Sequence, residues 1–460
     1  MPENGELRNS ICSNNGVVLL LEEADAADWV YRGEGAANVV LGYAGSSPAF
    51  VGKVIRIQKS PRSMAKCTAE TSTLSTHENL LWKEYIMSST SKEISQLLFV
   101  QNVMVPLLGS EHVDPGMHVP VSRVFLEAVE KNILGQRPPW RVEGGKVNTM
   151  SDTALLISDH SIFPHGGHQD TRCISIEIKP KCGFLPCSRF IAEDNDTKRC
   201  ITRFQMHQVL KLHQGEISQL SDYNPLDLFS GSHNRINKAI KALFTTPQNN
   251  FRIFVNGSLV YGGLGCSADS SNFDRGGELE DMFEGIIQAD HGQRLETFLL
   301  LIGETIFSSR VLAPLLEAQK LDSLDIEGAI HAYYNIMSQP CHVCGDLVDS
   351  KTLQMYQSLH SISLEESVKI VRDYLIAATA KDCSLMISFR AGEHENYVSP
   401  YGKVYLESTN QSFDYKAYFI DLDMKPLKKM THYHELDKKI IHCFKQNEMQ
   451  QGPSSLCNRY

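Results

Sequence analysis

The 460-residue sequence contains no apolar run that approaches the roughly 20 residues needed to span a lipid bilayer, which argues against a membrane-spanning protein. Its first apolar stretch, Val17–Leu21, is shorter than the hydrophobic region of a signal peptide, and the acidic residues Glu3 and Glu6 precede it. We therefore expect an intracellular protein, cytoplasmic or nuclear or both, without membrane insertion.

The sequence also lacks an excess of basic residues and an internal repeat. Its 44 lysines and arginines are outnumbered by 54 aspartates and glutamates, which gives a net charge of -10. This balance argues against a protein that coats nucleic acid, because such proteins neutralise many phosphates over a broad basic surface. A polyanionic ligand would have to bind where basic side chains cluster locally. We expect a monomer that binds small molecules and no nucleic acid.

Twelve cysteines are spread along the chain, and in a reducing compartment they are expected to be free thiols or metal ligands and not disulfides. One group has the residue types of a zinc site: His331, Cys341-x-x-Cys344 and His360, separated by nine, two and fifteen residues. Four protein ligands leave no open coordination position, so this zinc ion would be structural. The spacing differs from that of zinc fingers, and a chance grouping among seventeen histidines is the alternative.

Strand and helix patterns alternate irregularly along the chain, which predicts an α+β fold without a regular βαβ repeat. From Trp29 to Lys59, three apolar segments are separated by two glycine-containing turns, as in an antiparallel sheet. The extended run 154–158 ends at Asp159 and His160, before a glycine-rich loop at 166–167, and we place a hinge there. The expected parts are a disordered tail, an N-terminal lobe, a larger C-terminal lobe and a second disordered tail, at 1–16, 17–158, 159–445 and 446–460.

A glycine-containing turn, Arg-Gly-Glu-Gly-Ala-Ala-Asn, lies between the first two predicted strands. Because glycine has no Cβ atom, the backbone at Gly33 and Gly35 can approach phosphate oxygens closely. Lys53 and Arg56 follow on the third strand, at the spacing of the cation that pairs with ATP phosphates in kinases. Strand alternation places the two on opposite faces, so one of them would face a nucleotide. An ordinary hairpin turn is the alternative interpretation.

The segment 173–181 reads Cys-Ile-Ser-Ile-Glu-Ile-Lys-Pro-Lys. Alternation predicts that the isoleucines are buried on one face, whereas Glu177, Lys179 and Lys181 point in the opposite direction. Pro180 suits the end of a strand, where α+β enzymes often present side chains to ligands. A strand with one solvated face would show the same pattern.

Two further rows of side chains have the four-residue spacing of one helix face. The first row is Arg203, His207 and Lys211, and the second is Lys425, Lys429 and Tyr433. Solvated helix faces often carry such basic stripes. The rows would form a polyanion site only if the fold brings them together.

Two acidic motifs follow a helix and a strand in the order that kinases use. The helical segment 363–380 begins with a capping box and carries its apolar residues on one face, and Asp382 follows directly before an apolar strand. About forty residues later, another strand ends at Asp421 and Asp423. In kinases the first carboxylate accepts the proton of the attacking hydroxyl, and the second holds the magnesium that bridges the ATP phosphates. Surface aspartates at the ends of elements are the alternative.

Taken together, seven segments resemble the plant-type inositol-pentakisphosphate 2-kinases: RGEGAAN, GKVIRI, EIKPKCGF, NPLDLFSG, TPQNNFR, AATAKDCS and FIDLDMKPLKK. EIKPK and AKDCS are specific to that family, and the resemblance extends over about residues 21–444. It implies an α+β, two-lobed inositol-phosphate kinase. The antiparallel-sheet N-lobe would resemble that of a protein kinase, and the larger α/β C-lobe would contain an inositide-binding part. The implied reaction is ATP-dependent phosphorylation of the 2-hydroxyl of inositol 1,3,4,5,6-pentakisphosphate to inositol hexakisphosphate, or phytate.

The resemblance also implies a role for individual residues. Asp382 would be the catalytic base, Lys179 would lie between the donor and acceptor phosphates, and Asp421 and Asp423 would bind Mg²⁺. ATP would be held by Gly33, Gly35, Asn38, Lys53, Arg56, Asp159, His160, Glu177, Asn250 and Arg252. The acceptor phosphates would be held by Arg141, Lys181, Arg203, Lys211, Asn249, Lys425, Lys429 and Tyr433. The structural Zn²⁺ set of His331, Cys341, Cys344 and His360 also matches the family.

Two other functions are open on the sequence. A catalytically inactive inositide sensor would keep only the basic pocket, although the presence of both Asp382 and Asp421 argues against it. A nucleic-acid zinc module would use the His/Cys set, but the chain has no basic domain to accompany it.

Overall fold

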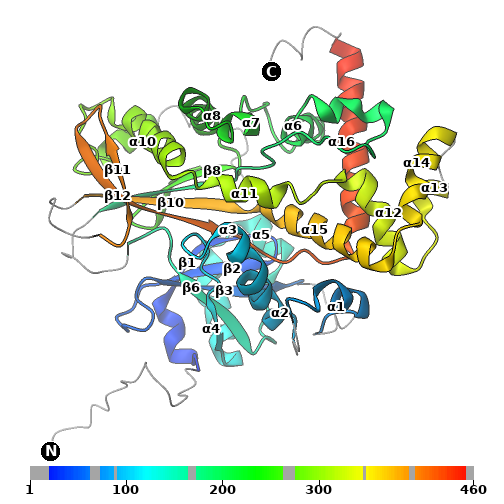
Figure 1. Cartoon of the computed structure of the whole chain (residues 1–460). Coiled ribbons are helices and arrows are strands. Elements are labelled where there is room, and N and C mark those ends of the chain that lie inside the picture. Colours follow the sequence, from blue (N-terminus) through cyan, green and yellow to red (C-terminus); the bar gives the residue numbers. More distant parts are fainter. Residues whose placement is uncertain are drawn as a thin grey trace, which may run out of the picture. The chain divides into compact units, whose positions relative to one another are not determined.

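The computed structural model describes residues 20–62, 73–86, 91–163, 172–262, 275–345, 349–392 and 399–451. These residues form two compact units, each with its own sheet and hydrophobic core (Figure 1). Unit 1 contains the described parts of 1–70 and 115–170, and unit 2 contains those of 71–114 and 171–460. The expected tail at 1–16 and the expected glycine-rich loop at 166–167 lie outside the described residues.

Unit 1 is built on a six-stranded antiparallel sheet of order β1-β2-β3-β6-β4, with β5 paired to β3. Alternate residues such as Val39 on β2 and Ile57 on β3 are fully buried and pack with Phe125 and Val129 of the helix Arg123–Ile133. One face of the sheet is therefore apolar, as is common for antiparallel sheets. The strands are β1 (Trp29–Glu34), β2 (Asn38–Tyr43), β3 (Lys53–Ser60), β4 (Met117–Pro120), β5 (Lys146–Val147) and β6 (Thr153–Ser158). The helices are η1 (Glu23–Asp28), α4 (Arg123–Ile133), η4 (Leu134–Gln136) and α5 (Pro139–Gly144).

Unit 2 is built on a second antiparallel sheet, of order β11-β12-β10-β7-β8-β9. Its strands are β7 (Cys173–Ile178), β8 (Phe251–Val255), β9 (Ser258–Tyr261), β10 (Ser384–Ala391), β11 (Gly402–Leu406) and β12 (Gln411–Ile420). All six residues of β7 are buried, including Ser175 and Glu177. The alternative of a strand with one solvated face is therefore wrong for β7. The strand lies between β10 and β8 with both faces covered, and both lysines follow its end.

The helices of unit 2 surround this sheet. Figure 1 shows α8 and α10 along the sheet, α12 to α15 at one end of it, and α16 beside α6 and α12. The helices before β7 are α1 (Thr76–Trp82), α2 (Lys92–Phe99), the π-helix η3 (Val100–Met104) and α3 (Val105–Leu108). Those between β7 and β9 are η5 (Glu193–Arg199), α6 (Arg203–His213), α7 (Pro225–Leu228) and α8 (His233–Thr245). The remaining helices are α9 (Arg275–Met282), α10 (Arg294–Ser309), α11 (Leu312–Gln319), α12 (Asp325–Met337), α13 (His342–Gly345), α14 (Ser350–His360), α15 (Leu364–Asp382) and α16 (Lys429–Gln451).

Helix α15 fulfils the prediction made for it from the sequence. The Ser363 side chain caps its first turn by accepting a hydrogen bond from the backbone N–H of Glu366. Val371 and Leu375 are fully buried on its apolar face. The helix ends at Asp382, and strand β10 begins two residues later.

Three segments differ from the expected organisation. Helices α1 to α3 belong to unit 2 and not to the expected N-terminal lobe of 17–158, because Trp82, Phe99 and Met104 are buried in the core of unit 2. Helix α16 continues to Gln451 and so enters the expected tail at 446–460. Lys425 precedes α16 and is not part of a helical row with Lys429 and Tyr433. Pro426 accounts for this, since a residue before proline is disfavoured in helical conformation.

Among the described helices, none is by itself long and apolar enough to cross a membrane. The bent pair α10 and α11, with an angle of 68° between the two helices, meets the length and composition criteria only when both are counted together. In this protein the pair contributes Phe298, Leu301 and Leu315 to the core of unit 2.

Candidate active site

The glycine-containing turn of unit 1 joins β1 to β2 and is braced by a buried carboxylate. The β1–β2 register shifts between Tyr31 and Gly33, and Glu34 directly after the shift is buried. Glu34 accepts hydrogen bonds from Arg137 at 2.8 and 3.0 Å and from Lys59 at 2.6 Å. Burial alone would raise the pKa of Glu34, but these cationic partners outweigh burial and lower it. These ion pairs hold the end of β1 in place before the turn. A Cβ atom built at Gly33 or Gly35 would have no other atom within 4 Å.

The strand register decides which sheet faces Lys53 and Arg56 occupy. Gly33 pairs with Val40 and Val40 pairs with Arg56, so Arg56 lies on the same face as the glycine turn, and so does Asn38. Lys53 lies on the opposite face, that of the core residues of β3, and its Nζ donates to Ser158 Oγ at 3.0 Å. The structure thus groups Arg56, and not Lys53, with Gly33 and Asn38.

Three other predicted site residues belong to unit 1. The Arg141 guanidinium, on α5, donates to the carbonyl of Gly35 at 3.1 Å, which places a predicted acceptor ligand beside the glycine turn. Asp159 and His160 follow β6 and are both buried. Asp159 Oδ1 accepts hydrogen bonds from the backbone N–H and the hydroxyl of Ser161, at 2.9 and 2.5 Å. These hydrogen bonds hold the backbone in place at the predicted hinge.

In unit 2, the end of β7 carries a connected row of charged groups. Glu177 accepts hydrogen bonds from Arg252 Nη1 at 2.7 Å and from Ser384 Oγ at 2.8 Å. The Lys179 ammonium donates to Ser384 Oγ at 2.8 Å and lies 3.6 Å from a carboxylate oxygen of Asp421. The register of β7 with β8 and β10 creates this row, since Glu177 pairs with Arg252 and β10 begins at Ser384.

The segment after β12 turns sharply at Asp421, whose φ of 61° is left-handed. Aspartate is among the few residues other than glycine that adopt this conformation without severe strain. The carbonyl of Asp423 accepts a hydrogen bond from Thr379 Oγ1 of α15 at 3.0 Å. This contact ties the segment that carries both predicted magnesium ligands to the helix that ends at Asp382.

Asp382 is paired with a cation but is accessible to solvent. Lys425 Nζ donates to its carboxylate at 2.8 Å, and the Asp382 side chain is 62% exposed. Burial of the group would raise its pKa, but the charge and hydrogen bond of Lys425, with the charges of Lys181 and Lys179, lower it. The carboxylate is therefore ionised at neutral pH and able to accept a proton.

The predicted acceptor ligands of unit 2 influence one another electrostatically. Burial, followed by the charge of Lys179, lowers the pKa of Lys181 to about 8. Burial also lowers the pKa of His207 to about 4, with further contributions from Arg203, Lys211 and Lys181. The lysines that follow β7 and the row of Arg203, His207 and Lys211 on α6 therefore lie close enough in unit 2 to affect one another's charge. Such a concentration of positive charge is unfavourable by itself and favourable once a polyanion binds.

Three remaining predicted ligands differ in exposure. Asn249 and Lys429 are exposed, whereas Asn250 is buried. The carbonyl of Asn250 accepts a hydrogen bond from the backbone N–H of Lys179 at 2.9 Å. Within the described part of the chain, the Asn250 Oδ1 atom is buried without a hydrogen-bond partner. Tyr433 lies near Asp382, since the charges of Lys425 and Asp382 both act on its hydroxyl.

The four predicted zinc ligands converge in the helical end of unit 2. Their ligand atoms all lie within 4.8 Å of one another. His331 Nδ1 is 3.3 Å from both Cys341 Sγ and His360 Nε2, and Cys344 Sγ is 3.4 Å from His360 Nε2. A tetrahedral zinc with bonds of about 2.0 to 2.3 Å requires ligand separations of about 3.3 to 3.8 Å. Asn335 Oδ1 lies 2.8 Å from His360 Nδ1, so the lone pair of Nε2 faces the cluster.

A family model described as inositol-pentakisphosphate 2-kinase matches residues 31–439. The chain belongs to the inositol-pentakisphosphate 2-kinase family. It is 53% identical to inositol-pentakisphosphate 2-kinase of Arabidopsis thaliana over 428 residues, which is 92% of this chain and 94% of the relative. The rice protein of that name (Oryza sativa subsp. japonica) is 51% identical over 431 residues, 93% of this chain and 96% of the relative. The zebrafish (Danio rerio) inositol-pentakisphosphate 2-kinase is 29% identical over 500 residues, 95% of this chain and 97% of the relative.

Membership in the inositol-pentakisphosphate 2-kinase family confirms the plant-type resemblance and the expected class of enzyme, a phosphotransferase. The mixed fold with antiparallel sheets is the α+β class that the sequence predicts. The family's name describes a kinase acting on inositol pentakisphosphate, which is the activity that the resemblance implied.

Some residues of the site were not recognised from the sequence. Ser384, which bridges Glu177 and Lys179, stands in the AKDCS segment, so its proximity to Asp382 was the available signal. Gln319 and Tyr223 give no such signal, because neither stands in a motif of characteristic spacing. Both contact the backbone after β7.

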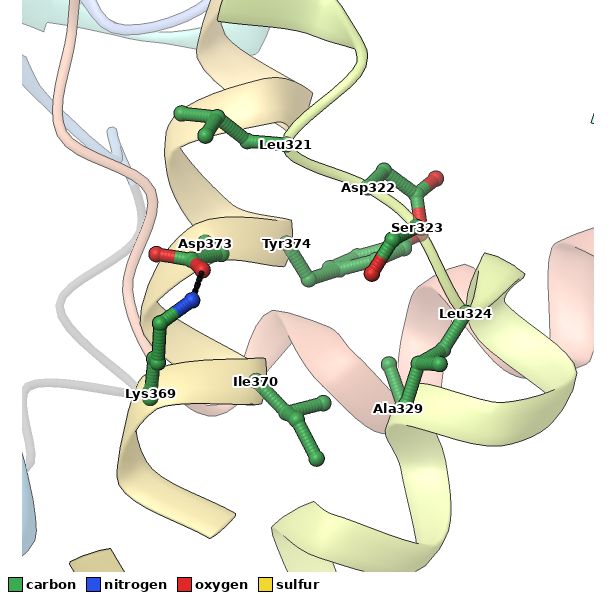
Figure 2. Close-up of a pocket in the computed structure, with 9 residues that line it drawn as sticks. All are labelled: Leu321, Asp322, Ser323, Leu324, Ala329, Lys369, Ile370, Asp373 and Tyr374. Atoms are coloured by element: carbon green, nitrogen blue, oxygen red, sulfur yellow. Dashed lines mark hydrogen bonds and ion pairs between the residues drawn. The ribbon is translucent and has the colours of Figure 1, made fainter. Parts of the chain in front are cut away.

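A small cavity of about 40 Å³ lies between α15 and the segment that joins α11 to α12 (Figure 2). Tyr374 and Asp322 both line it, and Lys369 Nζ donates to Asp373 Oδ2 at 2.6 Å at its edge. Binding sites for small molecules occupy about 300 to 1,000 Å³, so this cavity is too small for a nucleotide or an inositide. We assign no ligand to it.

Proposed function

We propose that this protein transfers the γ-phosphoryl group of ATP to the 2-hydroxyl of inositol 1,3,4,5,6-pentakisphosphate, giving inositol hexakisphosphate. The observation that carries the proposal is the accessible, ionised carboxylate of Asp382 beside Lys425, next to the cations Lys179 and Lys181. This arrangement places a proton acceptor within a basic site. The acceptor carries roughly ten negative charges, at up to about two per phosphate.

In this proposal, Asp382 accepts the proton of the 2-hydroxyl as that oxygen attacks the γ-phosphorus. Lys179 stabilises the charge on the transferred group, and its contact with Ser384 holds its ammonium in place. The acceptor phosphates are bound by a basic set: Arg141, Lys181, Arg203, Lys211, Asn249, Lys425, Lys429 and Tyr433. Charge-assisted hydrogen bonds from this set explain how an acidic protein binds a polyanion.

For the nucleotide we propose the ligands that the family resemblance implies. Gly33, Gly35, Asn38 and Arg56 contact the ATP phosphates, and the further ligands are Asp159, His160, Glu177, Asn250 and Arg252. Lys53 is left out of this set, because it lies on the sheet face opposite to Arg56. Asp421 and Asp423 hold Mg²⁺, and carboxylate oxygens suit this cation. Bound Mg²⁺ neutralises developing charge on the β- and γ-phosphates. The buried, unpaired Asn250 Oδ1 is an acceptor for a ligand N–H or hydroxyl. We further propose an intracellular monomer.

The activity is tested by incubating the purified protein with ATP, Mg²⁺ and inositol pentakisphosphate and separating the products by anion-exchange chromatography. Formation of inositol hexakisphosphate with stoichiometric ADP supports the proposal. Absence of hexakisphosphate, with the protein folded and nucleotide bound, rejects it. Inositol tetrakisphosphates offered in parallel show whether the 2-hydroxyl is the position modified.

The affinity for the acceptor is expected to fall above about pH 8. The pKa of Lys181 is lowered to about 8, so this side chain loses its proton as the pH rises through that value. The acceptor's charge is nearly constant there, because the second phosphate pKa is about 6. If only the charged lysine binds, KM for the acceptor rises about fivefold between pH 8 and pH 9, as the charged fraction falls from about one half to about one eleventh. Lys181→Arg, which stays charged, should flatten this rise, whereas an equal rise in both proteins contradicts the assignment.

We propose that the His331, Cys341, Cys344 and His360 set holds one structural Zn²⁺. Purified protein is expected to contain about one zinc per chain by mass spectrometry of metals. Cys341→Ser should abolish this zinc and lower the melting temperature by about 5 °C, since a bound metal stabilises the folded state. Cys200→Ser, at an exposed cysteine outside the set, is the control and should change neither quantity. Zinc retained at full stoichiometry in Cys341→Ser would refute the assignment.

A further inference from the structure

The carboxamide of Gln319 occupies a fully buried position at the end of α11. Its Oε1 accepts a hydrogen bond from the backbone N–H of Gly183 at 2.8 Å. Its Nε2 donates to the carbonyl of Lys181 at 2.8 Å and to the carbonyl of Ala380 at 3.2 Å. The amide therefore uses its acceptor and both its donors, and each of its three partners belongs to the backbone.

The first two partners lie in the loop that follows β7 and carries Lys179 and Lys181. Lys181 has a φ of 62°, a left-handed conformation that is unfavourable for lysine and persists only where other contacts impose it. Gln319 holds this turn from one side by binding the Lys181 carbonyl and the Gly183 N–H. Tyr223 holds the same turn at Pro180, since its hydroxyl donates to the carbonyl of that residue at 2.7 Å.

The third partner lies in the last turn of α15, two residues before Asp382. In a continuing helix the carbonyl of Ala380 would accept a hydrogen bond from the N–H of Ser384. The helix stops at Asp382, and Ser384 begins β10, so this carbonyl loses its intrahelical partner. Gln319 supplies a replacement and shares the carbonyl with the thiol of Cys383 at 3.4 Å.

We propose that Gln319 is a positioning residue for phosphoryl transfer. Its carboxamide joins the loop that carries Lys179 and Lys181 to the end of the helix that presents Asp382. This inference rests on the proposed function, because the value of the connection depends on these residues acting together on the reacting groups. A displacement of about 1 Å between catalytic groups can reduce turnover about 100-fold.

Two variants test the proposal. Gln319→Met fills the space but leaves the Gly183 N–H and both carbonyls without this partner. Gln319→Glu is isosteric, and burial keeps its carboxyl group protonated, so it retains the acceptor and one of the two donors. Leu315→Ala is the matched control, because Leu315 is fully buried on the same helix and contacts neither the loop nor Asp382 through hydrogen bonds.

The expected result for Gln319→Met is a fall in kcat of about 10- to 100-fold per folded molecule, with KM for ATP within twofold of the original value. Gln319→Glu should retain an intermediate kcat. Leu315→Ala should lower the melting temperature while kcat per folded molecule stays unchanged. A kcat for Gln319→Met equal to that of Leu315→Ala would overturn the proposal.

Hydrogen exchange, read without substrates, provides a second test. Amides of 181–184 and 380–384 are expected to exchange faster in Gln319→Met than in Leu315→Ala, and exchange in unit 1 should not change. Equal exchange in the two variants would overturn the connection between loop and helix. This measurement needs no turnover, so it tests whether Gln319 joins the loop to the helix even if the original protein forms no hexakisphosphate. A failure to form hexakisphosphate would count against the proposed function alone.

Discussion

Asp382→Asn is expected to lower kcat by about 10²- to 10⁴-fold, the range by which a positioned general base accelerates proton transfer. Asparagine keeps the shape of the side chain but cannot take up the proton of the attacking hydroxyl. Binding of the pentakisphosphate should be retained or tightened, because the substitution removes a negative charge from a site rich in cations and frees Lys425 from its ion pair. Turnover and calorimetric binding, measured on the same preparation, check both statements.

Asp373→Asn is the control for this experiment. Asp373 lies on the same helix and pairs with Lys369, distant in sequence from the helix end that carries Asp382. Its replacement should leave kcat unchanged. If Asp382→Asn kept more than a tenth of the original kcat, the base would have to be another group. If neither the original protein nor Asp382→Asn turned over but both bound the pentakisphosphate, the inactive-sensor alternative would be the better description.

Lys198→Met is expected to be the most destabilising single substitution that we predict. Lys198 is only 3% exposed, and its ammonium donates to Asp325, to Glu327 at 3.0 Å and to Asp437 at 2.7 Å. These partners come from α12 and α16, so the lysine on η5 joins three helices. Asp437 also lies 3.4 Å from Arg203, one of the proposed acceptor ligands.

Removing the cation leaves three buried carboxyl groups without their shared partner. Loss of one member of a buried ion pair typically costs about 3 to 5 kcal/mol, and we expect a loss of this size in chemical denaturation. Burial already raises the pKa of Asp325 to about 6, against the opposing charge of Lys198. Without the lysine, the carboxyl pKa rises further above its unfolded value. Protonation then favours the folded state, so the deficit should shrink as the pH falls through this raised pKa toward about 6.

Lys351→Met is the control for Lys198→Met. Lys351 pairs with Glu193, also on η5, but both side chains are exposed, and exposed ion pairs add little to stability. The denaturation midpoint should not change. A midpoint for Lys198→Met equal to that of Lys351→Met would show that the three carboxyl groups do not need the buried cation.

Much of the local structure of the site followed from sequence patterns. Helix α15 was predicted from its cap and its apolar spacing, and both are local properties of the chain. The position of Asp382 between that helix and β10 followed from the same pattern. The turn between β1 and β2 was predicted for a similar reason, since glycines between two apolar segments are a local signal of a turn.

Patterns failed where distant parts of the chain decide the environment. The polar alternation in β7 was compatible with a solvated face, but the strand lies inside the sheet between β8 and β10 and all six of its residues are buried. The row of Lys425, Lys429 and Tyr433 had helical spacing, yet Pro426 keeps Lys425 out of α16. Spacing describes neighbours in sequence and carries no information on which strand pairs with which.

The sequence by itself determined the family and several elements around the site, among them α15 and the turn between β1 and β2, because these depend on residue type and short-range spacing. Tertiary structure alone decided that Arg56 lies with Gly33 on one sheet face, that the side chains of His331, Cys341, Cys344 and His360 converge, and that Lys179 meets Asp421. It also decided that Gln319 joins the Lys181 loop to the end of α15. Each of these contacts links residues far apart in the chain, and such contacts arise from the joint packing of a core that no single segment specifies.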